Sequence, residues 1–277
     1  MTGTGGHDAG VFVRRPLVLL AAVLALSGPG CGGRNPRPVV VGTTANITAV
    51  VAAVAGDRVE NVTLAPAGMC PGHFDVRPSH VAAAARADLI IRQGWEEWFD
   101  DLARSLPEPR PRVVTAATGG NWMLPEVHRL AVLELAGLLA GLDTALADTF
   151  KLNAGRYLAR VDSASRAARA LLAGRSLPTA IAAEHQAPLL RWLGFRVVAT
   201  YGRPEDFTAR ELSRLARVGI DSAVGLVADN LQSGPDAGGP LAAAFGARHV
   251  NLTNFPLEDD YPATLLESAR TIARLLE

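Results

Sequence analysis

The stretch Thr144–Ala173, TALADTFKLNAGRYLARVDSASRAARALLA, decides how the rest of the chain is organised. Apolar residues recur through it at three- and four-residue steps, as at Phe150, Val161 and Leu172, while the arginines fall mostly elsewhere. This spacing predicts an amphipathic helix with one apolar face. At 1.5 Å per residue such a helix would be ~45 Å long, enough to run along a whole small domain. We therefore expect residues 143–175 to form a spine between two halves of the protein.

On both sides of this spine, short apolar runs alternate with helical runs. Strands are predicted at 39–41, 58–64, 89–91 and 112–114 before the spine, and at 177–183, 196–200, 223–228 and 249–252 after it. Alternation at this spacing indicates mostly parallel sheets with right-handed crossovers. The predicted fold class is α/β, with two doubly wound α/β lobes, 38–142 and 176–277, joined by a long backbone helix.

The composition is that of a globular protein with no net charge. The 277 residues suffice for one large or two modest domains, and 49% hydrophobic with 19% charged residues excludes a disordered chain. The formal net charge of zero gives no global attraction for nucleic acid or for an anionic membrane surface. We therefore expect no nucleic-acid partner.

The N-terminus has the pattern of an export signal. Arg14 and Arg15 precede an apolar run at Leu17–Leu26, and small residues then lead to Cys31. The apolar run is shorter than the ~20 residues that a membrane-spanning helix needs. Cys31 is predicted to be a lipidated first residue, with secretion and cleavage nearby as the alternative. Residues 1–31 are assigned to the signal and 32–37 to a tether, which places the protein outside the cytoplasm, either lipid-anchored or periplasmic.

The loop Pro66–His80 follows a predicted strand and is rich in residues that bind metals. Gly and Pro give it an irregular backbone that can aim a side chain, and it contains Cys70, His73 and Asp75. His73 has the strongest claim to be a functional residue. Cys70 is more simply a small buried residue, and His80 is a first-turn surface residue of the next helix.

Other strand ends carry further polar residues. Ligands of doubly wound lobes gather at the carboxyl ends of the strands. The remaining candidates at such ends are Asn121, Trp122, Glu184, His185, Asp229, Asn230, Asn254, Asp259 and Asp260. Imidazole together with carboxylate suits zinc, manganese or iron better than calcium or magnesium. The two lobes therefore offer ligands for a transition metal at places that can face one cleft.

Local signals inside the lobes predict caps and core residues. Ser79 is predicted to cap the helix that follows it, and Thr208 or Asp206 to cap the helix 208–218. Five ring side chains are interpreted as mostly core or packing residues: Trp95, Trp98, Trp122, Trp192 and His128.

The chain resembles the solute-binding lipoproteins of zinc and manganese ABC importers, the cluster A-I metal receptors. Four local matches carry the resemblance, which covers essentially the whole mature chain. They are Pro71-Gly72-His73 with Phe74-Asp75 and Pro78-Ser79; Trp122-Met123-Leu124-Pro125; Glu184-His185 before Trp192-Leu193-Gly194; and Leu252-Thr253-Asn254.

The resemblance implies a set of metal ligands, carried over one position at a time. The first falls on His73, the third on Glu184 or His185, and the fourth on Asn254, where the family has an acid, with Asp259 or Asp260 as the alternative. Gly120 or Asn121 occupies the second position. Four further residues are expected at the cleft or behind the ligands: Asn121, Trp122, Asp229 and Asp259.

The implied function is binding without catalysis. The protein would capture zinc or manganese as a transported ligand and deliver it to a membrane permease, as a monomer and without a catalytic cofactor. No His-Glu-x-x-His helix or Gly-x-Ser-x-Gly elbow is found in the sequence, which argues against a hydrolase. The alternative is a receptor for a metal chelate or an organic ligand, similar to a siderophore or cobalamin.

Overall fold

The computed structural model describes residues 1–6, 37–70, 72 and 74–277, without the side chain of Asp206. Residues 7–31 of the predicted export signal, which include Cys31, and His73 lie outside the described residues. Residues Pro36–Glu277 form one compact unit.

The first lobe is built on a four-stranded parallel sheet. Its strands are β1 (Val39–Thr44), β2 (Glu60–Ala65), β3 (Leu89–Arg92) and β4 (Arg112–Thr115), in the order β2-β1-β3-β4. Val41 pairs with Val62 on one side and with Ile90 on the other. The central strands β1 and β3 are nearly continuous apolar runs because helices cover both faces of a parallel sheet.

The second lobe repeats this topology. Its strands are β5 (Thr179–Ala183), β6 (Val197–Tyr201), β7 (Val224–Asn230) and β8 (Arg248–Leu252), in the order β6-β5-β7-β8. In each sheet the second strand pairs with one side of the first strand, and the third strand pairs with its other side. The strand order therefore reverses between β1 and β3 and again between β5 and β7, and such reversals are where ligands bind in open α/β sheets.

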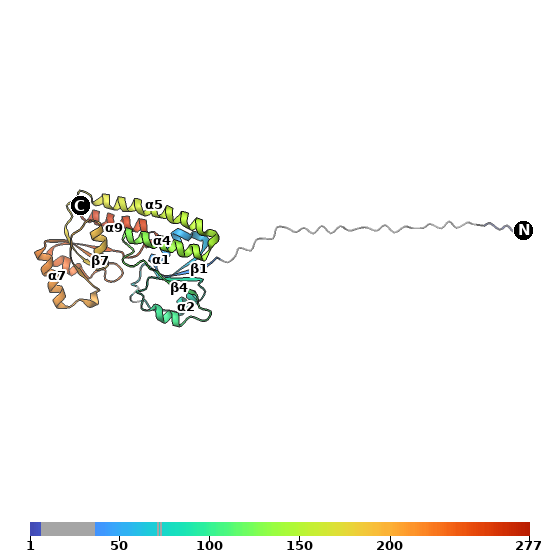
Figure 1. Cartoon of the computed structure of the whole chain (residues 1–277), viewed down its shortest axis with the longest axis horizontal. Helices are drawn as coiled ribbons and strands as arrows, with labels where there is room; N and C mark the ends of the chain where they lie inside the picture. The colour runs from blue at the N-terminus through green and yellow to red at the C-terminus, as the bar shows by residue number, and fades with distance from the viewer. Residues whose placement is uncertain (7–36, 71, 73) are drawn as a thin grey trace. The chain divides into compact units, whose positions relative to one another are not determined.

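Helices cover both sheets and connect the lobes (Figure 1). They are α1 (Ala45–Ala55), α2 (Pro78–Ala85), α3 (Phe99–Arg104), α4 (Pro125–Leu142), α5 (Ala147–Leu172), α6 (Ala187–Trp192), α7 (Ala209–Asp221), α8 (Gly239–Phe245) and α9 (Tyr261–Leu275). Short 3-10 turns lie at η1 (Gly56–Arg58), η3 (Thr144–Leu146), η4 (Pro204–Asp206) and η5 (Leu257–Asp259).

The long helix predicted from the sequence is confirmed as α5. A 3-10 turn, η3, precedes it, and the Asp143 carboxylate caps that turn by accepting from the amide of Ala145. Helix α5 packs against α9, α4 and α1 (Figure 1). One continuous cluster of buried side chains extends along these helices and includes residues of both sheets, such as Val40 in β1 and Val250 in β8. The two lobes therefore share a core along the spine.

His128 is at the centre of this shared core. It is fully buried, its ring stacks on Tyr261 at 3.7 Å, and its Nε2 lies 3.0 Å from the Tyr157 hydroxyl. Its Nδ1 lies 3.2 Å from the carbonyl oxygen of Trp122. Burial lowers the pKa of His128 to about 3, with a smaller opposing effect from the Trp122 carbonyl. The imidazole is thus a neutral packing group that links α4, α5 and α9.

Some local predictions are wrong. Helix α2 begins at Pro78, so Arg77 and not Ser79 is its N-cap residue, because proline fits the first helical position. His80 is half-buried there, and its Nδ1 accepts from the Arg77 amide at 3.0 Å. Trp95 is 48% exposed and is not a core residue. The Thr208 cap is confirmed, since its hydroxyl accepts from the Glu211 amide at 3.1 Å.

Candidate functional site

A pocket of about 320 Å³ lies between the carboxyl ends of the two sheets. Each of the eight strands is followed by residues that line it, so both lobes contribute equally to its walls. The lining residues are Asn46, Cys70, Gly72, Gln93, Trp95, Gly120, Asn121, Trp122, His185, Arg203, Asn230, Gln232, Ser233, Asn254 and Phe255.

The two topological reversals supply the middle of the pocket. Asn46 follows β1 and Gln93 follows β3, while His185 follows β5 and Asn230 ends β7. A ligand in this pocket would therefore lie at the switch points of both sheets at once.

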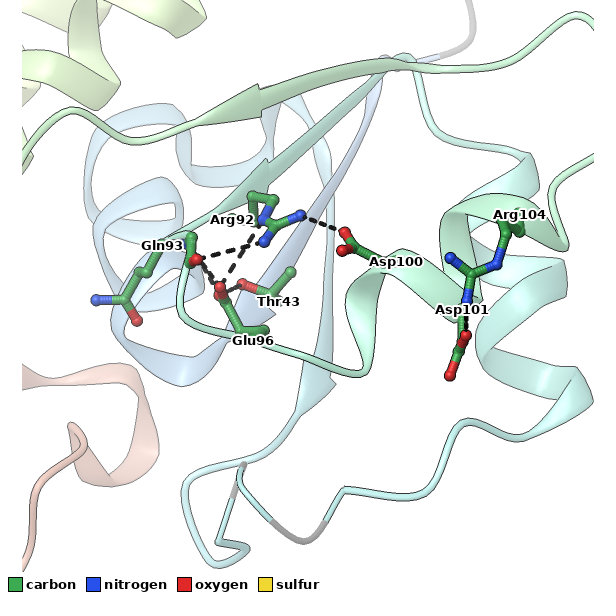
Figure 2. Close-up of polar contacts among 8 residues, drawn as sticks. Thr43, Arg92, Gln93, Glu96, Asp100, Asp101 and Arg104 are labelled. Atoms are coloured by element: carbon green, nitrogen blue, oxygen red, sulfur yellow. Dashed lines mark hydrogen bonds and ion pairs between the residues drawn. The ribbon is translucent and has the colours of Figure 1, made fainter.

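A buried carboxylate, Glu96, shapes the loop that follows β3 (Figure 2). Gln93 and Trp95, which line the pocket, belong to this loop. Glu96 accepts hydrogen bonds from the Thr43 hydroxyl and from the backbone amides of Gln93, at 2.8 Å, and Gly94, at 2.6 Å. Arg92 extends between two acids, with its Nε 4.0 Å from Glu96 and its Nη1 3.1 Å from Asp100. Glu96 thus holds a sharp loop in which Gly94 has a φ of 98°, a conformation that favours glycine.

The amide of Gln93 is held from the end of β1. Its Oε1 accepts from the Thr44 hydroxyl at 2.9 Å. Because Thr43 binds Glu96 and Thr44 binds Gln93, the end of β1 fixes both the loop and its side chain.

In the second lobe a chain of amides forms the opposite wall. Buried Gln186 donates to Asn230 Oδ1 at 3.1 Å and to the Leu252 carbonyl at 3.0 Å. Asn230 in turn donates to the Ser233 hydroxyl at 2.6 Å. Gln232 accepts from the backbone amide of Asn254 at 2.9 Å. This wall is therefore ordered by side-chain amides that hold one another.

Three contacts join the lobes around the pocket. Asn121 Nδ2 donates to the carbonyl oxygen of His185 at 2.7 Å, and Gln232 Nε2 donates to that of Ala67 at 2.8 Å. Gly72 lies against Arg203 so closely that a Cβ atom there would be 2.2 Å from Nη2 of the guanidinium. The first lobe thus contacts the second through two of its pocket loops, the one after β2 and the one after β4.

Two buried oxygen atoms of the lining have no hydrogen-bond partner among the described residues. They are Oδ1 of Asn46, in the first turn of α1, and Oδ1 of Asn254, after β8. A buried acceptor without a partner costs about 1–3 kcal/mol, so such atoms in a native structure call for an explanation. Here a ligand that supplies hydrogen-bond donors or positive charge would explain both.

The structure brings some of the predicted site residues to the pocket and leaves others outside it. Five of them line the pocket: His185, Asn254, Asn121, Trp122 and Asn230. His73 is outside the described residues, although its neighbour Gly72 is part of the lining.

The acidic candidates do not line the pocket. Glu184 is exposed beside it, and Asp259 is exposed on η5. Asp229 is fully buried behind Asn230, where its Oδ2 lies 2.6 Å from His249 Nε2 and accepts from the Gly238 amide at 2.9 Å. Its other oxygen accepts from the Tyr201 hydroxyl. Asp229 is therefore a structural carboxylate that supports the end of β7.

His185 presents an imidazole suited to metal binding. Partial removal from water lowers its pKa; the charge of Glu184 opposes this shift, and that of Arg203 adds to it. The ring is consequently neutral at pH 7, the form that binds a metal. Within the described part of the chain, no three or more His, Cys, Asp or Glu side chains converge into a metal-binding group.

Sequence reasoning missed Asn46, Gln93 and Glu96. Asn46 lies in Gly42-Thr43-Thr44-Ala45-Asn46, directly after the first strand, and its place at a strand end could have identified it. No comparable signal existed for Glu96, because its role depends on the fold of its own loop around it.

The fold and the pocket together define a two-lobed binding protein whose lobes are linked by a long helix. The model of the family described as zinc-uptake complex component A, periplasmic (ZnuA), matches residues 40–275, and the chain belongs to that family. A curated relative, the metal ABC transporter substrate-binding lipoprotein FimA of Streptococcus parasanguinis, is 27% identical over 95 residues. That match spans 32% of this chain and 31% of the length of FimA.

Solved structures show the same fold. A crystal structure of ZnuA has a TM-score of 0.75 at 18% identity and covers 87% of this chain and 100% of its own. A zinc-bound ZnuA with residues 138–173 deleted has a TM-score of 0.74 at 18% identity, covering 86% and 97%. A manganese-bound mutant of a periplasmic metal-binding protein from candidatus Liberibacter asiaticus has a TM-score of 0.74 at 17% identity, covering 87% and 100%. Across the residues described here, no helix is both long and apolar enough to span a membrane.

Proposed function

We propose that this protein is the extracytoplasmic solute-binding component of an ABC importer. It captures a divalent transition metal, zinc or manganese, in the pocket between its lobes and delivers it to a membrane permease. The observation that carries the proposal is the pocket at the switch points of both sheets, with a neutral imidazole, His185, in its wall. Family membership and the zinc- and manganese-bound relatives support it.

The proposed ligands come from both lobes. They are His73, which follows Gly72 in the sequence, and His185 and the oxygen of Asn254, which belong to the pocket lining. Glu184 is exposed beside His185 and can join them only by turning inward. The shared core along α5 restricts the lobes to a small movement, so release depends on the permease distorting the site. The protein acts as a monomer, anchored through Cys31, without catalysis and without a catalytic cofactor.

Metal analysis and thermal unfolding test this function. Protein purified without chelators should contain zinc or manganese, and adding the metal to stripped protein should raise Tm by several degrees, because a ligand bound only by the folded state stabilises it. His73→Ala and His185→Ala should remove that gain. His80→Gln is the matched control, since His80 lies in the first turn of the helix that follows this loop and does not line the pocket. An unchanged gain in His73→Ala would contradict the assigned site.

A second candidate, a receptor for a metal chelate or an organic ligand, is favoured by the size and chemistry of the pocket. Its volume of about 320 Å³ is roughly ten times the ~30 Å³ that one water molecule occupies in the liquid. Amide side chains outnumber metal-binding side chains in its described lining. Copurification of an organic molecule with the protein, detected by mass spectrometry, would support this candidate.

A further inference from the structure

The pocket needs a negative charge if it is to hold a bare dication. A doubly charged ion is costly to remove from water unless groups of opposite charge surround it. Among the described lining residues there is no Asp or Glu, and the Arg203 guanidinium lies 4.0 Å from the Glu205 carboxylate. His185 binds a metal as a neutral ring. Of the described lining side chains, the Cys70 thiol is the one that readily becomes an anion.

The structure presents Cys70 to the pocket from a loop that is held in place. Cys70 is half-buried, forms no disulfide bond within the described part of the chain and belongs to the pocket lining. Gln232 of the second lobe donates to the Ala67 carbonyl at 2.8 Å. The Met69 amide donates to the Pro66 carbonyl at 3.0 Å, and the Met69 side chain packs against buried apolar residues of the first lobe. The two neighbouring sulfur atoms therefore have different surroundings, the core for Met69 and the pocket for Cys70.

A buried acceptor on the neighbouring strand end lacks a partner. Asn46 is 4% exposed and lines the same pocket, and its Oδ1 has no hydrogen-bond partner among the described residues. Asn46 follows β1 and Cys70 follows β2, and these strands pair through Thr44 and Ala65 at their carboxyl ends. The thiol and the unpartnered oxygen thus come from adjacent strand ends of one sheet. A cation bound by the thiolate would supply the positive charge that this oxygen lacks.

We infer that Cys70 Sγ binds the transported metal directly and makes the pocket selective for zinc over manganese. On binding, the thiol gives its proton to solvent and the thiolate forms the metal–sulfur bond, so the wall neutralises one of the two positive charges. His185, from the second lobe, remains the proposed imidazole ligand. Thiolate is a soft ligand that suits zinc, whereas manganese prefers carboxylate and water oxygens. This inference rests on the proposed function, because it concerns how the same pocket holds its metal.

Cobalt(II) is a spectroscopic probe for the metal–sulfur bond. It occupies zinc sites with visible absorption bands, and it adds an intense near-ultraviolet charge-transfer band when a thiolate is among its ligands. The reduced, metal-free full chain should show both kinds of band at saturating cobalt. Cys70→Ser should keep the visible bands and lose the charge-transfer band. Cys31→Ser is the matched control, because it removes the other cysteine of the chain and should leave both kinds of band unchanged.

Zinc and manganese affinities test the selectivity. Removing a group that merely orients a ligand costs roughly 10–100-fold in metal affinity. Cys70→Ser should therefore lower zinc affinity, measured by competition with a chromophoric chelator, by at least roughly 100-fold. Manganese affinity should fall by less than roughly tenfold, because manganese gains little from a thiolate. Circular dichroism confirms that each variant is folded, and Cys70→Ala repeats the test without a hydroxyl that could replace the thiol.

The outcomes separate the inference from the function on which it rests. Visible cobalt bands without a charge-transfer band in the wild type overturn the inference and leave the proposed function intact. Equal zinc affinity of the wild type and both Cys70 variants does the same. A charge-transfer band that persists in Cys70→Ser and disappears in Cys31→Ser also overturns the inference, because the thiolate would then belong to Cys31. Binding of neither cobalt nor zinc by the wild type overturns both.

Discussion

At the scale of single residues, buried polar groups divide into two kinds. Asp229 and Glu96 are buried carboxylates whose oxygens accept several hydrogen bonds each, so they hold the ends of strands and the loops that follow. Asn46 and Asn254 each have an unpartnered oxygen in the pocket. The hydrogen-bonded carboxylates hold the loops of the site in place. The unpartnered amide oxygens indicate where a bound ligand would supply the missing interaction.

His128 gives the clearest prediction at this scale. Its folded-state pKa of about 3 lies below the ordinary value of 6.5, so the unfolded chain binds a proton that the folded chain does not. Stability is therefore complete above pH 6.5 and falls as the pH drops toward 3. Between pH 7 and pH 5 the wild type should lose about 2 kcal/mol more of its unfolding free energy than His128→Gln. Denaturant unfolding at both pH values measures this, and equal losses would contradict it.

At the scale of secondary structure, the carboxyl end of each strand and the loop that follows it position the residues that line the pocket. The sheets agree with the alternation in the sequence, and α5 agrees with the spacing of its apolar residues. The beginning of α2 was predicted wrongly because Pro78 initiates the helix before Ser79 can cap it. The β3–α3 loop is held by hydrogen bonds to one side chain. The Glu96 carboxylate accepts from the Thr43 hydroxyl and from the backbone amides of Gln93 and Gly94.

We expect Glu96→Gln to loosen this loop. A carboxamide replaces one of the two accepting oxygens with a donor, so one backbone amide of the loop loses its partner, at a cost of about 1–3 kcal/mol. The variant should be less stable in denaturant unfolding and should show a smaller metal-dependent rise in Tm, because the backbone that carries Gln93 and Trp95 is no longer fixed. Asp100→Asn is the control, since Asp100 contacts Arg92 from the exposed side. Unchanged stability of Glu96→Gln would show that the buried carboxylate does not hold the loop.

At the scale of the whole molecule, the lobes share one core. The cluster of buried residues along α4, α5 and α9 includes side chains from β1 and β5 alike. Outer clusters cover the far face of each sheet. This division predicts lobes that unfold together and move only slightly against one another.

Val161→Ala should reveal the shared core. Val161 is buried on α5, and removing its two methyl groups should cost about 2 kcal/mol. Tryptophan fluorescence and far-UV circular dichroism should shift together in a single unfolding transition. Leu152→Ala, on the exposed face of the same helix, should change stability by less than about 0.5 kcal/mol. Two separate transitions would show that the lobes are independent.

Local signals in the sequence were enough to predict the alternation of strands and helices, the spine, and five residues that line the pocket. These residues were found because strand ends can be recognised locally and because the carboxyl ends of parallel strands meet at one edge. They are His185, Asn254, Asn121, Trp122 and Asn230. These features depend on residues that are neighbours in the sequence, so periodicity and local motifs can predict them.

Which side chains face the pocket and which support it depends on contacts between distant parts of the chain. Glu184 and His185 are neighbours in sequence, yet the imidazole lines the pocket and the carboxylate does not. Asp229 turns inward to Tyr201 and His249. The contact of Asn121 with His185 joins residues 64 positions apart. Such choices depend on which distant groups satisfy a buried polar atom, and no local pattern contains that information.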